Sequence, residues 1–290
     1  MALLTRRLGR TEHQSSHAIL GGAMFWNADA ESTALAFQLA LDAGVNHVDI
    51  APAYGHAEIV AGPHIAAHRD RLFIGEKTGR KNPDGVRADL ERSLDRLGCT
   101  AFDLYQVHGV VSLDDLETRV SAFETILRAR DEGLTRFVGI TGHDLGTAAA
   151  QLEAVKRYDL DSVMLPVYPR ALADPQYATD LAALFDECAR RDVAVMAIKA
   201  GAWQPWGDRA KTATPWYEPF ADADLVQRAV NFTLSTPGVH AFCTPGDLTI
   251  LPAVLEAAAH YQPASPADRD ALLTEAASWP IIFPLADNAR

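Results

Sequence analysis

Short apolar runs alternate with longer amphipathic segments along almost the whole chain, and this alternation limits the possible folds more than any other feature. Eight runs look like buried strands, at Ala18–Gly21, His47–Ile50, Leu72–Gly75, Leu104–Val107, Phe137–Ile140, Ser162–Leu165, Val193–Ile198 and Val239–Phe242. Helical patterns occupy Glu31–Ala43, Ala57–Ala66, Pro83–Leu97, Leu113–Asp131, Gly146–Arg157, Thr179–Arg191, Ala223–Ser235 and Leu251–His260. Strands that alternate with helices pair in parallel. Eight such units predict an α/β fold, a closed parallel (β/α)8 TIM barrel, as a single domain over residues 1–290.

Two segments exceed what a minimal barrel needs. The chain has 290 residues, and a barrel of this class typically needs about 250. One extra segment is a long loop at about 201–222, after the seventh predicted strand. The other is a C-terminal tail at about 262–290, with a helix predicted at Pro266–Ser278. We expect both segments to be additions to the barrel.

The composition argues against several classes of function. Lysine and arginine number 26 against 38 aspartate and glutamate, a net charge of −12, so a nucleic-acid partner is not expected. Cys99, Cys188 and Cys243 are widely spaced without a C-x-x-C, which argues against a bound metal and against a disulfide framework. No apolar stretch reaches the roughly 18 residues of a membrane helix, and the N-terminus lacks a secretory pattern. We expect a cytoplasmic protein with no membrane partner.

Three of the predicted strands end in an ionisable residue. Asp49 ends the segment N-H-V-D, Lys77 ends L-F-I-G-E-K, and His108 ends F-D-L-Y-Q-V-H. Tyr54 lies five residues beyond Asp49, in the loop that follows the strand. The carboxyl ends of barrel strands converge on one face, which carries the active site in barrel enzymes. We therefore predict that these four side chains share one polar pocket at that face.

An acid, a phenol, an amine and an imidazole in one pocket form a proton-transfer site. Lys77, kept charged by Asp49, is expected to stabilise a phenolate and to lower the pKa of Tyr54 below its usual value of about 10. His108 can donate a hydrogen bond to a carbonyl oxygen. Together these groups would polarise a carbonyl and protonate the oxyanion as it forms. No side chain delivers hydride, so such chemistry requires a nicotinamide cofactor.

The same residues resemble a known family. The motif D-x-A-x-x-Y-G, which begins at Asp49, is followed by a strand that ends in Lys77 and a strand that ends in His108. This order of motifs resembles the aldo-keto reductase superfamily, and the resemblance runs through most of the chain. It implies a catalytic tetrad of Asp49, Tyr54, Lys77 and His108, with NAD or NADP bound across the barrel mouth without a Rossmann domain. It also implies a small-molecule carbonyl or alcohol as substrate.

Several cofactor positions of the family are altered here. The family usually places a Ser-Asn pair after the fifth strand to bind the nicotinamide amide; Thr141 can replace the hydroxyl, and His143 can replace the amide. The usual glutamine on the sixth strand and the usual aromatic residue on the seventh are missing. Lys199, at the end of the seventh strand, is a candidate partner for a cofactor phosphate. The cofactor site is therefore expected to use different side chains.

The segment after the eighth strand favours NAD over the family's usual NADP. Thr244, Gly246 and Asp247 are candidate cofactor residues there, because the Pro-Gly turn is kept and a following helix N-terminus can bind phosphate. No lysine or arginine occurs between Arg228 and Arg269, although a 2′-phosphate normally needs a basic partner. Asp247 would repel that phosphate, or would accept a hydrogen bond from a free ribose hydroxyl. Either NAD is used, or a base from a distant segment completes the site, or the cofactor site is degraded.

Three of the five tryptophans, Trp203, Trp206 and Trp216, lie in the loop at 201–222. Aromatic packing can pin such a loop to the barrel. The same side chains can also form a wall over the strand ends, where a substrate would bind. We therefore take the three tryptophans as candidate substrate-binding residues and expect at least one of them to face the pocket.

Two other functions compete with carbonyl reduction. A strand-end lysine, Lys77 or Lys199, can form a Schiff base with a carbonyl substrate, which would make the protein an aldolase-like lyase. The altered cofactor positions also permit a catalytically weak nucleotide-binding or regulatory subunit on the same fold. The order of the four motif residues favours the oxidoreductase.

Overall fold

The structure is a computed structural model, and it describes residues 2–284. Eight strands form a closed barrel in the order β12-β3-β4-β5-β6-β7-β8-β9, and every neighbouring pair is parallel. The strands are β3 (Ala18–Gly21), β4 (His47–Asp49), β5 (Phe73–Thr78), β6 (Phe102–Val107), β7 (Thr135–Thr141), β8 (Ser162–Pro166), β9 (Ala194–Ile198) and β12 (Ala241–Cys243). The predicted (β/α)8 barrel is thus confirmed, and each expected strand is present with its ends shifted by a few residues.

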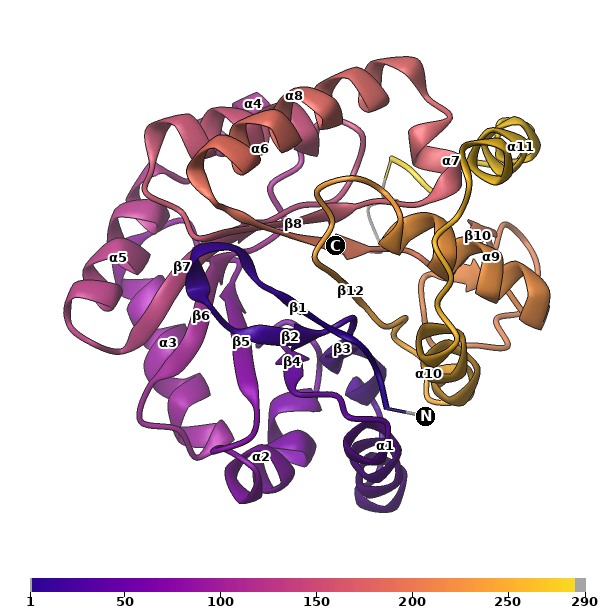
Figure 1. The fold of residues 1–290 in the computed structure, drawn as a ribbon. Helices are drawn as coiled ribbons and strands as arrows, with labels where there is room; N and C mark the ends of the chain where they lie inside the picture. Colours follow the sequence, from indigo (N-terminus) through magenta and orange to yellow (C-terminus); the bar gives the residue numbers. More distant parts are fainter. Residues whose placement is uncertain (1, 285–290) are drawn as a thin grey trace.

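Helices surround the barrel (Figure 1). They are α1 (Ala30–Asp42), α2 (Ala57–Ala67), α3 (Pro83–Leu97), α4 (Leu113–Glu117), α5 (Val120–Asp131), α6 (Thr147–Arg157), α7 (Pro169–Leu172), α8 (Pro175–Arg191), α9 (Ala223–Leu234), α10 (Leu251–Ala259) and α11 (Pro266–Ala276). No helix within residues 2–284 is both long and apolar enough to cross a membrane. The single helix expected at Leu113–Asp131 is wrong: α4 and α5 are separated at Thr118–Arg119, where the Arg119 side chain turns toward the strand ends.

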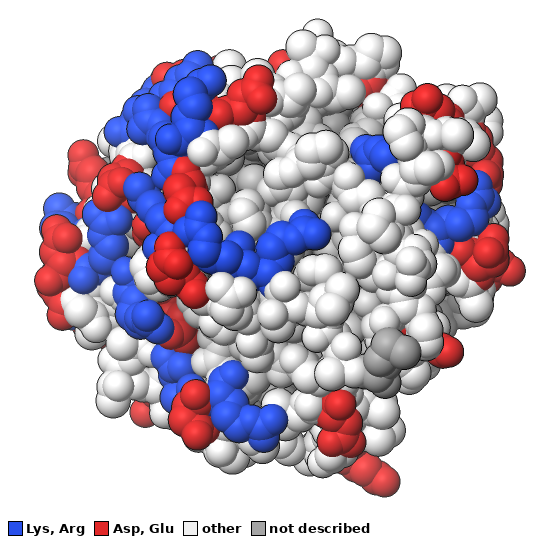
Figure 2. Space-filling model, in the orientation of Figure 1, with Lys and Arg blue, Asp and Glu red and all other residues white. Residues whose placement is uncertain are grey.

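An N-terminal hairpin closes the end of the barrel opposite the predicted site. It consists of β1 (Thr5–Arg7) and β2 (Gln14–Ser16), paired antiparallel, and lies across the barrel in Figure 1. Leu8 from its turn is fully buried in the apolar cluster that fills the barrel. Charged side chains of both signs are interleaved over part of this face (Figure 2), and Arg10 pairs there with Asp161 at 2.7 Å. These contacts fix the hairpin to the barrel, so ligands must enter from the carboxyl end of the strands.

The barrel interior is apolar near the β1–β2 hairpin and polar at the other end. Its cluster comprises Leu8, Ile19, Phe73, Leu104, Met164, Ala194, Met196, Ile198 and Ala241. Side chains alternate in direction along each strand, so Phe73 and Lys77 both point inward, and Glu76 points out toward the helices. A side chain that points inward at the start of a strand therefore packs in the apolar core. A side chain that points inward at the end of a strand lies at the barrel mouth.

The loop at 201–222 contains a second hairpin, β10 (Ala202–Pro205) and β11 (Tyr217–Pro219), paired antiparallel with a register irregularity. The tail continues through α11 to a buried Ile282 and Phe283. Phe283 lies 6.1 Å from Trp216 between ring centroids, so the tail packs against the hairpin. The last part of the predicted tail, residues 285–290, lies outside the described residues.

A buried acid pair lies between β5 and α2. Glu76 and Glu58 are 0% and 1% exposed, and the Glu58 carboxylate accepts a 2.8 Å hydrogen bond from Arg96. Glu76 Oε1 accepts the Lys77 N–H at 2.7 Å, whereas Glu76 Oε2 and Glu58 Oε1 have no hydrogen-bond partner among residues 2–284. Burial, and then repulsion by Glu58, raise the pKa of Glu76 well above its usual value despite the nearby Lys77 ammonium. Glu76 is therefore protonated in the folded protein at pH values where the unfolded chain is ionised.

This raised pKa predicts a pH-dependent gain in stability from Glu76→Gln. The folded state holds a proton that the unfolded chain releases above about pH 4.3, so wild-type stability falls as pH rises through that value toward the folded-state pKa. The glutamine cannot ionise and keeps an oxygen for the Lys77 N–H. Relative to wild type, the variant should gain at most about 1.4 kcal/mol per pH unit over that interval. Urea unfolding at pH 4, 6 and 8, with exposed Glu124→Gln as control, measures this; a pH-independent difference would contradict it.

Candidate active site

The carboxyl ends of the strands enclose one cavity that holds all four motif residues. Asp49 ends β4, Lys77 lies on β5, His108 follows β6, and Tyr54 comes from the loop between β4 and α2. The full lining is Gly21, Gly22, Ala23, Asp49, Tyr54, Lys77, His108, Thr141, His143, Met164, Ile198, Lys199, Tyr217, Cys243, Thr244, Pro245 and Gly246. The structure therefore brings the acid, the phenol, the amine and the imidazole into one pocket.

Asp49 and Lys77 form a buried ion pair at the base of this pocket. Their side chains are almost fully buried and in direct contact. Lys77 Nζ also donates to the Ile50 carbonyl at 2.9 Å, and Gln106 Nε2 donates to Asp49 Oδ1 at 3.2 Å. Burial alone would lower the pKa of Lys77, but the Asp49 carboxylate outweighs it and raises that pKa above the usual value. Lys77 is therefore a fixed ammonium group.

Tyr54 lies between the ammonium and the imidazole. Lys77 Nζ is 5.3 Å from the centroid of the Tyr54 ring, and the Tyr54 and His108 rings are perpendicular with centroids 5.8 Å apart. Burial raises the pKa of Tyr54 above its usual value, and Lys77 opposes this only in part. Lys77 does lower this pKa, as expected, but the expectation that the pKa of Tyr54 falls below its usual value is wrong for the protein alone, because the sequence does not reveal how deeply the phenol is buried. Tyr54 keeps its proton at neutral pH.

His108 is a neutral imidazole. Burial lowers its pKa well below the usual value, and the positive charges of Lys77, Arg119 and Lys199 add to that effect. His143 faces it, with ring centroids 5.8 Å apart. Burial, Lys199 and Lys77 lower the pKa of His143 to about 3. Both rings therefore present neutral nitrogen atoms, which can donate or accept hydrogen bonds.

Two polar atoms of the pocket are buried without a partner in the described part of the chain. They are Thr141 Oγ1, at the end of β7, and His143 Nδ1, two residues farther on. A buried polar atom left unpaired costs free energy, so a ligand that pairs with it is favoured. A carboxamide carries both a donor and an acceptor. These two atoms therefore fit the amide of a nicotinamide ring.

At one wall of the pocket, two glycines allow neighbouring segments of main chain to pack closely together. A Cβ atom added at Gly21 would lie 2.6 Å from the Thr244 carbonyl oxygen, and one at Gly22 would lie 2.6 Å from an Ile50 side-chain carbon. The Gly21 N–H donates to Thr244 Oγ1 at 3.0 Å, which joins β3 to the segment after β12. This wall is therefore narrow, smooth and built largely from main-chain atoms.

Lys199 supplies a second ammonium group at the end of β9. It has a φ of 72°, a strained value for a residue other than glycine. Its Nζ lies 4.7 Å from the centroid of Tyr217 and 5.1 Å from that of Trp216. It has no ion pair among residues 2–284, and burial lowers its pKa to about 8. Since Asp49 neutralises Lys77, Lys199 leaves the pocket with an excess positive charge that suits a phosphate.

Four residues singled out in the sequence do not line the cavity. Asp247 is buried behind Gly246, where its carboxylate accepts the Thr214 N–H at 2.6 Å and the Thr249 N–H at 2.8 Å. The other three are the tryptophans of the loop: Trp203, Trp206 and Trp216. Tyr217, next to Trp216, forms the wall instead.

The β10–β11 hairpin explains why none of the three tryptophans lines the cavity, although Trp216 contacts Lys199 from behind it. Its pairing places Pro205 opposite Tyr217, so Trp206 and Trp216 flank the turn. Trp206 is buried and donates to the Pro215 carbonyl at 2.8 Å, and Trp216 packs against Phe283. The sequence shows that the loop is aromatic, but the direction of each ring depends on the hairpin register.

Comparison with known proteins identifies the family. The sequence profile of the Aldo/keto reductase family matches residues 18–213, and so includes the motif residues. An aldo-keto reductase of Mycobacterium avium is 34% identical over 139 residues, 46% of each chain. A methylglyoxal reductase of Yersinia pestis is 32% identical over 121 residues, 41% of this chain and 43% of the relative. The chain spans about half the length of the curated relatives it matches first.

Solved structures extend the similarity over the barrel. A Pseudomonas aeruginosa protein that is assigned to the aldo-keto reductases superposes with a TM-score of 0.69 at 25% identity. The match covers 89% of this chain and 95% of that one. The holo form of an aldo-keto reductase from Bacillus halodurans gives a TM-score of 0.70 at 18% identity, covering 99% of this chain and all of that one, and so shows the fold alone. With the family profile matched over more than half of its length, the chain belongs to the aldo/keto reductase family.

Proposed function

We propose that the protein is an NAD(P)-dependent oxidoreductase that interconverts an aldehyde or ketone and an alcohol. The observation that carries this proposal is the shared pocket, in which a protonated phenol lies between an ammonium–carboxylate pair and a neutral imidazole. Family membership supports the same chemistry. A small carbonyl compound such as methylglyoxal, the substrate named for the Yersinia pestis relative, is a suitable first assay substrate.

The side chains divide the proton chemistry of carbonyl reduction among them. Tyr54, as general acid, donates its proton to the carbonyl oxygen as negative charge develops there. Lys77 then stabilises the phenolate that remains, and Asp49 keeps Lys77 charged and in place. Neutral His108 can donate an N–H to the same oxygen and so orient the carbonyl. The raised pKa of Tyr54 suits this role, because the proton is present at neutral pH and leaves only as the oxyanion forms.

The cofactor would be bound by residues of the same pocket. Thr141 and His143 would pair with the nicotinamide amide, and Lys199 would meet a phosphate beside Thr244 and Gly246. When bound, the nicotinamide supplies the hydride that no side chain can deliver. Asp247 would act indirectly, since it holds the segment around Thr214 against the turn after β12. The substrate would then lie beside Tyr54, with Tyr217 in the wall near Lys199.

A Schiff-base lyase is the second candidate, and Lys199 is the residue that favours it. With a pKa near 8, a fraction of its amine is neutral and nucleophilic at neutral pH. Lys77 is less suitable because Asp49 keeps it protonated. Borohydride reduction in the presence of a carbonyl compound would trap a lyase covalently at Lys199. Cofactor oxidation without such trapping supports the reductase.

Tyr54→Phe is expected to cut the rate of carbonyl reduction at least about a hundredfold, the usual contribution of a general acid. The change removes only the acidic proton and keeps the ring, so the dissociation constant of the cofactor should change little. Steady-state kinetics with methylglyoxal and a fluorescence titration of cofactor give the two numbers. Tyr105→Phe is a matched control, because its hydroxyl donates to the Val86 carbonyl at 3.3 Å outside the pocket. A Tyr54 variant with near wild-type turnover would exclude Tyr54 as the acid.

NADH is expected to bind at least as tightly as NADPH. No lysine or arginine occurs between Arg228 and Arg269. A lost charge-assisted hydrogen bond, worth roughly 1.5–3 kcal/mol, weakens phosphate binding about tenfold or more. Dissociation constants of NADH and NADPH, measured side by side, test this prediction.

Tenfold tighter binding of NADPH would contradict the prediction and would direct attention to Lys211. This residue lies three positions from Thr214, in the segment that Asp247 holds. Lys211→Met would then abolish the NADPH preference.

A further inference from the structure

A buried arginine lies beneath the loop that carries His108. Arg119 occupies the junction between α4 and α5 and is only 7% exposed. Burying a guanidinium is unfavourable unless its donors are paired. Arg119 meets one carboxylate, that of Asp115, at 3.0 Å. Its remaining hydrogen bonds go to main-chain carbonyl oxygens, so Arg119 does more than form an ion pair with Asp115.

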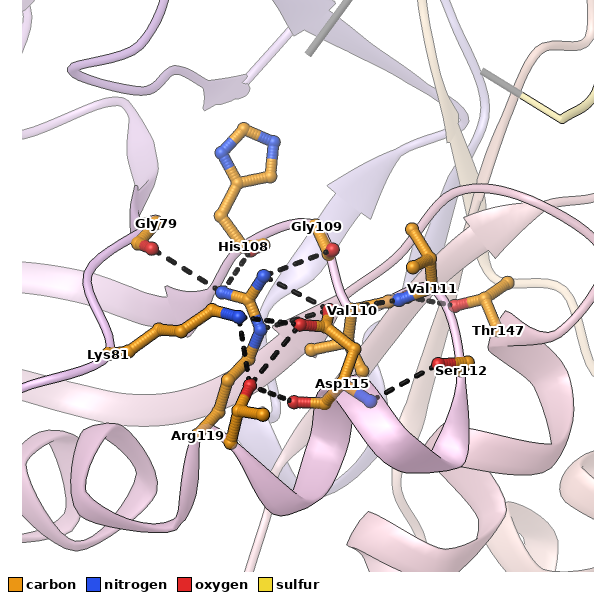
Figure 3. A network of polar contacts seen from close by, with 11 residues as sticks. Gly79, Lys81, His108, Gly109, Val110, Val111, Ser112, Asp115, Arg119 and Thr147 are labelled. Carbon is orange, nitrogen blue, oxygen red and sulfur yellow. Dashed lines mark hydrogen bonds and ion pairs between the residues drawn. The ribbon is translucent and has the colours of Figure 1, made fainter. Parts of the chain in front are cut away.

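The guanidinium joins the ends of two barrel strands. Nη1 donates to the His108 carbonyl at 3.1 Å and to the Gly79 carbonyl at 3.4 Å, and Nη2 donates to the Gly109 carbonyl at 3.4 Å. Gly79 follows β5, and the other two residues follow β6. Figure 3 shows the guanidinium among these three oxygens, with the His108 ring pointing away from it. One planar group therefore holds together the segment that follows β5 and the segment that follows β6.

The loop needs this support because it turns sharply. Gly109 has a φ of 77°, so the chain leaves the strand direction directly after His108. On either side of this turn the main-chain N–H groups bond to the neighbouring strands: the His108 N–H donates to the Thr78 carbonyl at 2.8 Å, and the Val110 N–H donates to the Thr141 carbonyl at 3.0 Å. The carbonyls of His108 and Gly109 have only Arg119 as a hydrogen-bond donor among residues 2–284. Without it, two partly buried acceptors would lose their partner.

The arginine is itself held from several directions. Its Nε donates to Asp115 Oδ2 at 3.1 Å, and Asp115 Oδ1 accepts from Lys81 Nζ at 3.0 Å. The Asp115 N–H donates to Ser112 Oγ at the start of α4, at 3.1 Å. Figure 3 shows these contacts as one connected network. A side chain locked by such partners can position another group precisely.

We propose that Arg119 is a positioning residue, which holds the main chain of His108 and Gly109 so that the His108 imidazole stays in place over the pocket. The proposal rests on the proposed reductase function, in which His108 orients the carbonyl. A displacement of about 1 Å in a catalytic group can cost a hundredfold in rate. Arg119 therefore affects turnover without touching the substrate, the cofactor or the reacting atoms.

Three variants test the proposal. Arg119→Met removes both the charge and the hydrogen bonds, whereas Arg119→Lys keeps the charge but cannot reach three carbonyls with one ammonium. Arg269→Met is the matched control, since Arg269 is partly buried and donates to the Phe232 carbonyl at 2.8 Å, away from the pocket. The thermal midpoint of each variant reports the structural cost common to all of them.

Both Arg119 variants should lower kcat for methylglyoxal reduction by about tenfold or more, with KM and the cofactor dissociation constant within about threefold of wild type. Arg269→Met should leave kcat unchanged at a similar loss of thermal stability. A kcat within twofold of wild type in Arg119→Met would overturn the proposal.

An NMR titration of His108 gives a readout that does not depend on activity. Positive charges act on this ring from β5 (Lys77), from β9 (Lys199) and, through the main chain side, from the α4–α5 junction (Arg119). The rings of His143, after β7, and of Tyr54, before α2, lie beside it. Arg119→Met should raise the pKa of His108 and broaden or split its ring signals, whereas Arg119→Lys should keep the pKa low and still disturb the signals. Ring signals unchanged in both variants would exclude a positioning role. If the wild type reduces no carbonyl compound, the proposed function fails, and the NMR result alone decides the role of Arg119.

Discussion

The contact between Asp49 and Lys77 is the interaction on which the pocket depends. Each charge is nearly fully buried, and either one alone would be very costly to remove from water. Paired, they allow a permanent ammonium group to lie at the base of a buried pocket. The Ile50 carbonyl and the Gln106 amide satisfy further donors and acceptors of the pair. The charge that acts on Tyr54 is thereby fixed before any ligand enters.

The rest of the pocket is arranged around this fixed charge. Lys77 contributes to the low pKa values of His108 and His143, so both imidazoles are neutral where a carbonyl or an amide would need donors and acceptors. Tyr54 keeps its proton because burial outweighs the ammonium. Lys199 adds a charge that no carboxylate neutralises among the described residues. In the proposed function, proton donation would occur near Lys77 and anion binding near Lys199, at separate places in the pocket.

Much of this architecture could be predicted from the sequence, because it depends on periodic patterns. Buried strands and helices follow from runs such as Leu104–Val107 and Pro83–Leu97, and inward positions follow from alternation along each strand. The β1–β2 hairpin was missed because its strands, T-R-R and Q-S-S, have no apolar pattern. The break at Thr118–Arg119 was missed because neither proline nor glycine marks it. Burial depth and ring direction, as for Tyr54 and Trp216, depend on distant segments, so local sequence does not reveal them.

The pairing of β12 with β3 has a consequence for how the protein can fold. The first and last barrel strands are neighbours, so β3 has only one partner until residues 241–243 are in place. Before that point, β3 and β9 are both open edges, and open edges attract other chains. The barrel has to close through contacts that span more than 220 residues, which is slow compared with local pairing. Chains that stop short of β12 are therefore expected to aggregate, and newly made chains depend on protection until their last strand has been synthesised.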